Sequence, residues 1–301
     1  MGNWNEVLKE INLGHDHVRR SYLAKLHKTT KRNVLCYYSG WLQKTAPQFN
    51  NIVSITDEDK GAFMSCFFEL DFNVGLDLVI HSPGGRVTAT ESLIHYVRSK
   101  FGSDIRVFVP QLAMSGGTLL ALSGKEIWMG KHSNLGPIDP QFGNWPAVTL
   151  IDEFERAFGE IKADPAKMHV WAPVLSQVPP TLLTQAKQAI ELSEAIAIEA
   201  LCDGMFKDMP DRKEKAEAIA KELTNVKTHK EHGRHIHADD CKAMGLNIKD
   251  LEGDPKLQDA LLTVHHAFMV TLSNTNAGKI IENHKGAAFV KNTPAVQLVQ
   301  A

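Results

Sequence analysis

The chain has 301 residues, of which 43% are hydrophobic and 23% are charged. These proportions are those of an ordinary globular protein and exclude a disordered, collagen-like or disulfide-stapled chain. The 33 basic and 35 acidic residues give a net charge of −2, and this balance argues against a nucleic-acid partner. The four cysteines form no C-x-x-C pair, so they predict neither a structural zinc site nor a redox motif.

The sequence contains no signal-peptide core and no run of about 18 uncharged apolar residues that would predict a membrane span. We therefore expect a soluble, cytoplasmic protein.

Short apolar runs and helical patterns alternate along the first half of the chain. Apolar residues recur at helical spacing through residues 4–26 and indicate an N-terminal helical arm over residues 1–30. Residues 33–38, 76–81 and 105–109 are typical of buried strands, and a helical pattern at 88–101 separates the last two. This order predicts an α/β fold with a mostly parallel sheet.

The second half is largely helical. After a short helix and a strand, a loop rich in glycine and proline precedes long helical patterns; the predicted elements are a helix at 118–122, a strand at 126–129, the loop at 134–143, and helices at 150–161, 182–206 and 207–230. No repeat or low-complexity linker divides the chain. We expect one catalytic domain over residues 31–250 and a C-terminal helical extension over residues 251–301.

Two glycines follow the second predicted strand. The segment His-Ser-Pro-Gly-Gly-Arg ends that strand and opens a helix, with Gly84 and Gly85 at the junction. Glycines there let a backbone approach a ligand and leave amide N–H groups free to bind an anion. Neither a dinucleotide-binding nor a P-loop pattern is present. Two interpretations of the segment remain, an oxyanion-binding site and a simple tight turn.

Ser115 occupies the matching place after the next predicted strand. Small residues surround it, Gly116 and Gly117 among them, so a sharp turn there would expose the hydroxyl beside the Gly116 amide. A helix N-cap would also explain a serine at this position. Because the carboxyl ends of parallel strands share one edge of a sheet, Gly85 and Ser115 are expected to face one site.

These segments resemble the Clp protease/crotonase superfamily. Within it, the S-P-G-G and A-x-S-x-G-x-x-L-A elements in residues 80–97 and 109–141, together with residues 257–290, are similar to the signal peptide peptidase A and serine dehydrogenase proteinase branch. The resemblance implies a Clp/crotonase-like fold of ββα units, Ser115 as nucleophile and the Gly85 and Gly116 amides as oxyanion hole. It also implies a homo-oligomer and a polypeptide substrate, and we expect no cofactor and no metal.

The general base is less defined. Clp proteases place a histidine where this chain has Gly-Pro-Ile-Asp-Pro, with no histidine. Relatives of signal peptide peptidase A use a desolvated lysine from a later helix. Lys187, in the more apolar helix, and Lys162, in the better-matching local pattern, are the candidates; a solvated lysine is the alternative for each.

Two further segments bear on the site. Asp139 lies in a proline-restricted loop that is expected either to shape the substrate cleft, together with Gly84 and Gly117, or to hydrogen-bond the base. Four histidines lie within residues 229–237; by analogy with the family, His232 or Arg234 could approach Ser115, to orient a base or to bind a substrate carboxylate. A metal site or a structural loop are alternatives, although no cysteine or carboxylate completes an established zinc pattern.

The residues together predict an ATP-independent serine endopeptidase. A catalytically inactive oligomeric scaffold of the same fold is the main alternative, because no histidine stands at the usual place. An acyl-CoA enzyme of the crotonase type shares the oxyanion-hole chemistry, but the serine at position 115 disfavours it.

Overall fold

A computed structural model describes residue 7, residues 14–143 and residues 145–294 of the chain. Part of the predicted helical spacing at residues 4–26 therefore lies outside the described residues. The helices are α2 (His15–Thr30), α3 (Asn50–Val53), α4 (Glu58–Phe67), α5 (Val87–Phe101), α6 (Gly116–Leu122), α7 (Ala147–Ala163), α8 (Met168–Leu175), α9 (Leu182–Asp203), α10 (Arg212–Thr224), α11 (Val226–His229), α12 (Ala238–Ala243) and α13 (Pro255–Asn274). The strands are β1 (Asn33–Ser39), β2 (Leu76–His81), β3 (Ile105–Val109), β4 (Leu112–Ala113), β5 (Glu126–Met129), β6 (Asn134–Leu135), β7 (Gln141–Phe142), β8 (Trp145–Pro146), β9 (Ile236–His237), β10 (Ile248–Asp250), β11 (Ala277–Asn283) and β12 (Ala288–Asn292).

Seven of the described strands form the central sheet, in the order β10-β5-β3-β2-β1-β11-β12. The first five of these run parallel to one another, while β11 and β12 are antiparallel to their neighbours. Strands β2, β3 and β5 have the bounds that the sequence predicts, because each is a short run in which apolar residues predominate beside a single charged residue. The predicted α/β fold with a mostly parallel sheet is confirmed.

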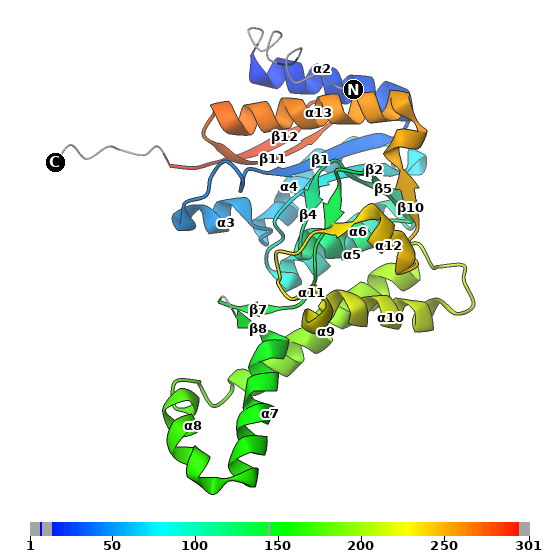
Figure 1. Cartoon of the computed structure of the whole chain (residues 1–301). Coiled ribbons are helices and arrows are strands. Elements are labelled where there is room, and N and C mark those ends of the chain that lie inside the picture. Colours follow the sequence, from blue (N-terminus) through cyan, green and yellow to red (C-terminus); the bar gives the residue numbers. More distant parts are fainter. Residues whose placement is uncertain (1–6, 8–13, 144, 295–301) are drawn as a thin grey trace, which may run out of the picture.

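Helices cover both faces of the sheet. On one face α2 and α13 lie side by side, and on the other α4, α5 and α6 pack (Figure 1). Strand β1 serves both layers, since Val34, Cys36 and Tyr38 join the core under α2 and α13 while Leu35 and Tyr37 join the core under the other helices. Successive side chains of a strand point to opposite faces of the sheet, so a strand that is buried on both faces contributes alternate residues to the two cores.

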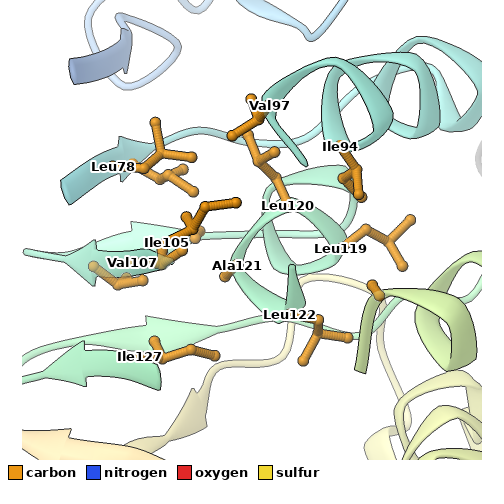
Figure 2. Packing of buried hydrophobic residues seen from close by; sticks show 14 of the residues in the cluster. Leu78, Ile94, Val97, Ile105, Val107, Leu119, Leu120, Ala121, Leu122 and Ile127 are labelled. Atoms are coloured by element: carbon orange, nitrogen blue, oxygen red, sulfur yellow. The ribbon is translucent and has the colours of Figure 1, made fainter. Parts of the chain in front are cut away.

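Helix α6 lies at the centre of the core between the sheet and helices α4 and α5. Its residues Leu119 to Leu122 pack between α5 and strands β2, β3 and β5 (Figure 2). All seven residues of α6 are buried, so the helix is fixed in position. Its first residue, Gly116, directly follows Ser115, and the packing of α6 therefore fixes the place of that serine.

The C-terminal segment differs from the helical extension that the sequence predicts. Helix α13 is present, but β11 and β12 follow it and extend the central sheet beyond β1. Strand β11 was missed because Lys279 and Glu282 interrupt its apolar run. Both side chains are fully buried in ion pairs, with Asp59 and Arg19 respectively.

Helices α7 and α8 form an arm that extends away from the sheet (Figure 1). The short β7–β8 hairpin joins this arm to the body, pairing Gln141 with Pro146 and Phe142 with Trp145. Among the described residues, none of the helices combines the length and hydropathy needed to cross a membrane.

Candidate active site

Ser115 occupies a strained turn between β4 and α6. Its backbone has φ 52° and ψ −116°, a conformation that costs a non-glycine residue free energy and that is concentrated at functional sites. The residue is half-buried, and its side chain makes no capping hydrogen bond to α6. The N-cap explanation for this serine therefore fails, and the geometry is that of a nucleophile elbow.

Backbone hydrogen bonds join this turn to the loop after β2. Ser82 N donates to Leu112 O at 3.1 Å and Met114 N donates to Ser82 O at 2.9 Å, which forms a parallel bridge between Ser82 and Ala113. The two strand ends that carry the glycine pair and Ser115 thus lie side by side, as the sequence predicts for neighbouring parallel strands.

Both glycines after Pro83 are required by close approaches of the backbone. Gly84 has φ +92°, and a Cβ there would lie 2.6 Å from Gly116 N and 2.8 Å from Ser115 Cβ. A Cβ on Gly85 would lie 2.3 Å from Ile55 N and 2.4 Å from Ile55 O. No side chain fits at either position without displacing backbone, so the turn depends on glycine.

The amides of Gly85 and Gly116 are available to a ligand. Ile55 N donates to Gly84 O at 2.8 Å and Arg86 N donates to Ile55 O at 3.0 Å, so this bridge does not use the intervening Gly85 N–H. Gly116 is the first residue of α6, where the amide has no intrahelical acceptor. A Cβ on Gly116 would lie 3.2 Å from Gly85 N, which places the two amide groups close to each other beside Ser115.

His232 and Asp139 form a hydrogen-bonded pair that lines one cavity with Ser115. His232 Nδ1 lies 2.8 Å from Asp139 Oδ1, and the Asp139 side chain is 2% exposed against 28% for His232. Because a carboxylate only accepts hydrogen bonds, this contact requires a proton on Nδ1, and a neutral imidazole with that proton keeps its lone pair on Nε2. The other carboxylate oxygen of Asp139 accepts a hydrogen bond from Gln141 Nε2 at 2.5 Å. The arrangement is that of an oriented general base.

Asp139 and His232 are 93 positions apart in the sequence and meet on two loops that adjoin a short ladder. Strand β6 pairs antiparallel with β9, with Asn134 opposite His237 and Leu135 opposite Ile236. Beyond this ladder, the loop after β6 carries Asp139 and the loop before β9 carries His232, so both residues lie at the same end of the ladder. Sequence alone gave both residues as candidates but could not pair them, because ladders this short leave no periodic signal.

The loop that carries Asp139 is anchored at several points. Thr118 Oγ1 donates to Gly136 O and accepts from Gly136 N, at 2.8 and 3.0 Å. Ser193 Oγ of α9 donates to Ile138 O at 2.7 Å. Fixed by α6 and α9 in this way, the carboxylate is held in place before any substrate arrives.

One cavity of about 400 Å³ brings these groups together. Its lining includes Ser115, Gly84, Gly85, Asp139 and His232. Among the hydrogen bonds of the described residues, none joins Ser115 Oγ to His232; in a site without substrate such a bond is commonly long and forms fully in the substrate complex. Ser115, Gly85 and the His232–Asp139 pair thus share one concave site.

The other predicted residues lie elsewhere. Lys162 on α7 and Lys187 on α9 are exposed and are not among the residues that line the Ser115 cavity. Arg234 is exposed and lines a separate cavity. Gly117 is buried beneath the turn, its N–H donating to Met114 O at 2.8 Å.

Two of the four histidines of residues 229–237 bond to different partners. His229 Nε2 lies 2.8 Å from Glu222 O, whereas His232 pairs with Asp139. Within the part of the chain that the structure describes, no group of three histidine, cysteine or acidic side chains is placed to hold a metal ion.

His81 is near the site in sequence but is not part of it. It ends β2, is fully buried, and both ring nitrogens lack a hydrogen-bond partner among the described residues. Burial lowers its pKa to about 3, so the ring is neutral at physiological pH. It does not line the Ser115 cavity, which leaves His232 as the histidine placed to act on Ser115.

Comparison with known proteins identifies the family of the chain. A family model described as ClpP-like SDH-type serine proteinase matches residues 52–257, more than half of the chain. The chain belongs to this family. The matched span contains Ser115, Asp139 and His232, and the fold predicted from the resemblance is thereby confirmed.

Two relatives come from the archaeon Methanocaldococcus jannaschii. The uncharacterized protein MJ1495 is 33% identical over 171 residues, which cover 57% of this chain and 51% of the relative. The uncharacterized protein MJ0137 is 31% identical over 194 residues, which cover 64% of this chain and 60% of the relative. The similarity therefore spans between half and two thirds of the length of each relative.

Proposed function

We propose that this member of the ClpP-like serine proteinase family hydrolyses peptide bonds with Ser115 as nucleophile, His232 as general base and Asp139 as the group that orients the base. The observation that carries the proposal is the shared cavity, in which Ser115 and the hydrogen-bonded His232–Asp139 pair face the same space. Of the three candidate bases, His232 alone lines that cavity, and Lys162 and Lys187 are solvent-exposed.

Acylation follows from these positions. Ser115 Oγ attacks the carbonyl carbon of the scissile peptide while its proton passes to His232 Nε2, and the carbonyl oxygen becomes an oxyanion. The Gly85 and Gly116 N–H groups donate to that oxyanion. His232 then returns the proton to the leaving nitrogen, the C–N bond breaks, and the acyl group stays on Ser115 as an ester.

In deacylation a water molecule is the nucleophile and Ser115 is the leaving group. His232 removes a proton from a water molecule whose oxygen attacks the ester carbonyl, and the same two amides hold the second oxyanion. Collapse of this intermediate breaks the bond to Ser115 Oγ, which regains the proton from His232 and releases a carboxylic acid product. The Asp139 carboxylate stabilises the imidazolium that exists between the two transfers.

The proposal extends to substrate and assembly. We propose a polypeptide substrate in an already unfolded state, because the reaction written above uses no nucleotide, and a homo-oligomer in solution, as the family resemblance implies. Cytoplasmic localisation remains an expectation.

Hydrolysis of an unfolded protein tests the activity. Wild-type protein should cleave fluorescein-labelled casein without ATP, and Ser115→Ala and His232→Ala should lose at least 99% of that rate while keeping the wild-type circular dichroism spectrum. Cleavage by Ser115→Ala at the wild-type rate would refute the nucleophile. A folded oligomer that neither cleaves casein nor reacts with serine-directed probes would favour the scaffold, and saturable binding of a CoA thioester would favour the crotonase alternative.

A further inference from the structure

A buried ion pair lies beside the oxyanion loop. Lys279 Nζ on β11 lies 2.8 and 2.9 Å from the two carboxylate oxygens of Asp59 on α4, and both side chains are fully buried. Neither residue lines the Ser115 cavity, so neither contacts a substrate there.

Two further hydrogen bonds connect the pair to residues 54–56, and a third connects it to Tyr37. Lys279 Nζ donates to Ser54 O at 2.6 Å, and Asp59 Oδ2 accepts from Thr56 N at 3.0 Å. The same oxygen accepts from Tyr37 OH at 2.9 Å. The pair therefore holds this short segment from both ends.

Ile55, the residue in the middle of the segment, forms the bridge that shapes the oxyanion loop. Its N–H and C=O bond to Gly84 O and Arg86 N at 2.8 and 3.0 Å, and its backbone is the surface against which Gly85 packs. Any shift of Ile55 therefore moves the Gly85 N–H. A displacement of about 1 Å in such a group is enough to cost about 100-fold in rate.

The energetics of the pair favour a geometric role. Burial lowers the pKa of Lys279 even though the Asp59 carboxylate raises it, which shows that the desolvation of the ammonium is not fully offset. Buried ion pairs of this kind contribute little net stability compared with apolar residues of the same volume. What the pair supplies is three directed hydrogen bonds to fixed backbone and side-chain atoms, which apolar side chains cannot make.

We infer that Lys279 and Asp59 are positioning residues for the oxyanion hole, acting through Ile55 on the amide of Gly85. This inference rests on the proposed function, in which that amide stabilises the oxyanion. It assigns a role to a strand that lies outside residues 52–257, the span that the family model matches.

A matched pair of double variants tests it. Asp59→Asn/Lys279→Met removes both charges with little change in volume. Arg19→Met/Glu282→Gln removes another buried pair, whose side chains are 1% and 0% exposed and whose glutamate lies on the same strand β11 but contacts α2. Loss of structure alone would affect both variants alike.

The first readout is the second-order rate constant for labelling by a fluorophosphonate, whose phosphoryl oxygen occupies the oxyanion hole. Measured on folded protein well below each melting temperature, it should fall by about 10- to 100-fold in the Asp59/Lys279 variant and by less than 3-fold in the Arg19/Glu282 variant. Equal rates in the two variants would overturn the inference.

The second readout does not depend on activity. Hydrogen–deuterium exchange of the peptides covering residues 52–58 and 82–90 should be faster in the Asp59/Lys279 variant and unchanged in the Arg19/Glu282 variant. If wild-type protein fails to react with the probe, the proposed function is refuted, and the exchange result still decides whether the pair holds the loop. Unchanged exchange in both peptides would overturn the inference.

Discussion

Replacing Gly85 by alanine should disable the site while leaving most of the fold intact. The new Cβ would lie 2.3 Å from Ile55 N and 2.4 Å from Ile55 O, whereas real Cβ contacts are at least about 3 Å. Since both neighbours are backbone atoms, the oxyanion loop and the Ile55 segment must separate by more than half an ångström. We expect about 1–3 kcal/mol of destabilisation from the strain and a loss of about 100- to 1,000-fold in kcat from the displaced donor.

Gly61→Ala is the matched control. Gly61 lies within α4, and a Cβ there would meet nothing within 4 Å. Alanine should stabilise this helix by about 0.5–1 kcal/mol without affecting activity. Casein hydrolysis and urea unfolding measured on both variants separate the two effects. If Gly85→Ala kept more than a tenth of the wild-type kcat, the assignment of its amide to the oxyanion hole would be wrong.

Three further predictions address the base and the buried histidine. His232→Ala should lower fluorophosphonate labelling by at least 1,000-fold while Lys162→Ala and Lys187→Ala change it by less than 3-fold; loss of labelling in either lysine variant instead would move the base to that lysine. Asp139→Asn should lower kcat by about 1,000-fold with a small change in KM, and a KM effect alone would reduce Asp139 to a cleft-shaping residue. Burial lowers the pKa of His81 to about 3, so the unfolded state takes up a proton first as the pH falls. The contribution of His81 to the free energy of unfolding should be constant above about pH 6.5 and fall by up to ~1.4 kcal/mol per pH unit below it, in addition to the contributions of His265 and His284, whose pKa values burial also lowers. Urea unfolding between pH 7 and pH 4.5 measures this slope, and His81→Phe should reduce it; an unchanged slope would exclude His81 as its source.

The sequence predicts well those parts of the fold that depend on local pattern. Strands β2, β3 and β5 stand at the predicted residues because each is a short, mostly apolar run, and β2 is buried along its whole length. The place of Ser115 beside Gly85 follows from one topological rule, that neighbouring parallel strands end at the same edge of the sheet. Its role as nucleophile remains a prediction for the labelling experiment.

What the sequence could not predict depends on contacts between distant segments. Strand β11 was missed because Lys279 is a charged residue in a buried position, and its partner Asp59 lies 220 residues earlier in the chain. The pairing of His232 with Asp139 depends on two loops that adjoin a ladder of only two residue pairs. Ile55 and Gln141, which position Gly85 and Asp139, carry no motif of their own and are recognised from the hydrogen bonds alone.

The central claim is that Ser115 is the nucleophile of a hydrolytic site. Intact-mass and peptide mass spectrometry of protein treated with a fluorophosphonate probe test it most directly. The account predicts one phosphonyl adduct per chain, located on Ser115, absent from Ser115→Ala and suppressed by His232→Ala. An adduct that persists in Ser115→Ala, or one located on another residue of the wild-type protein, would contradict it.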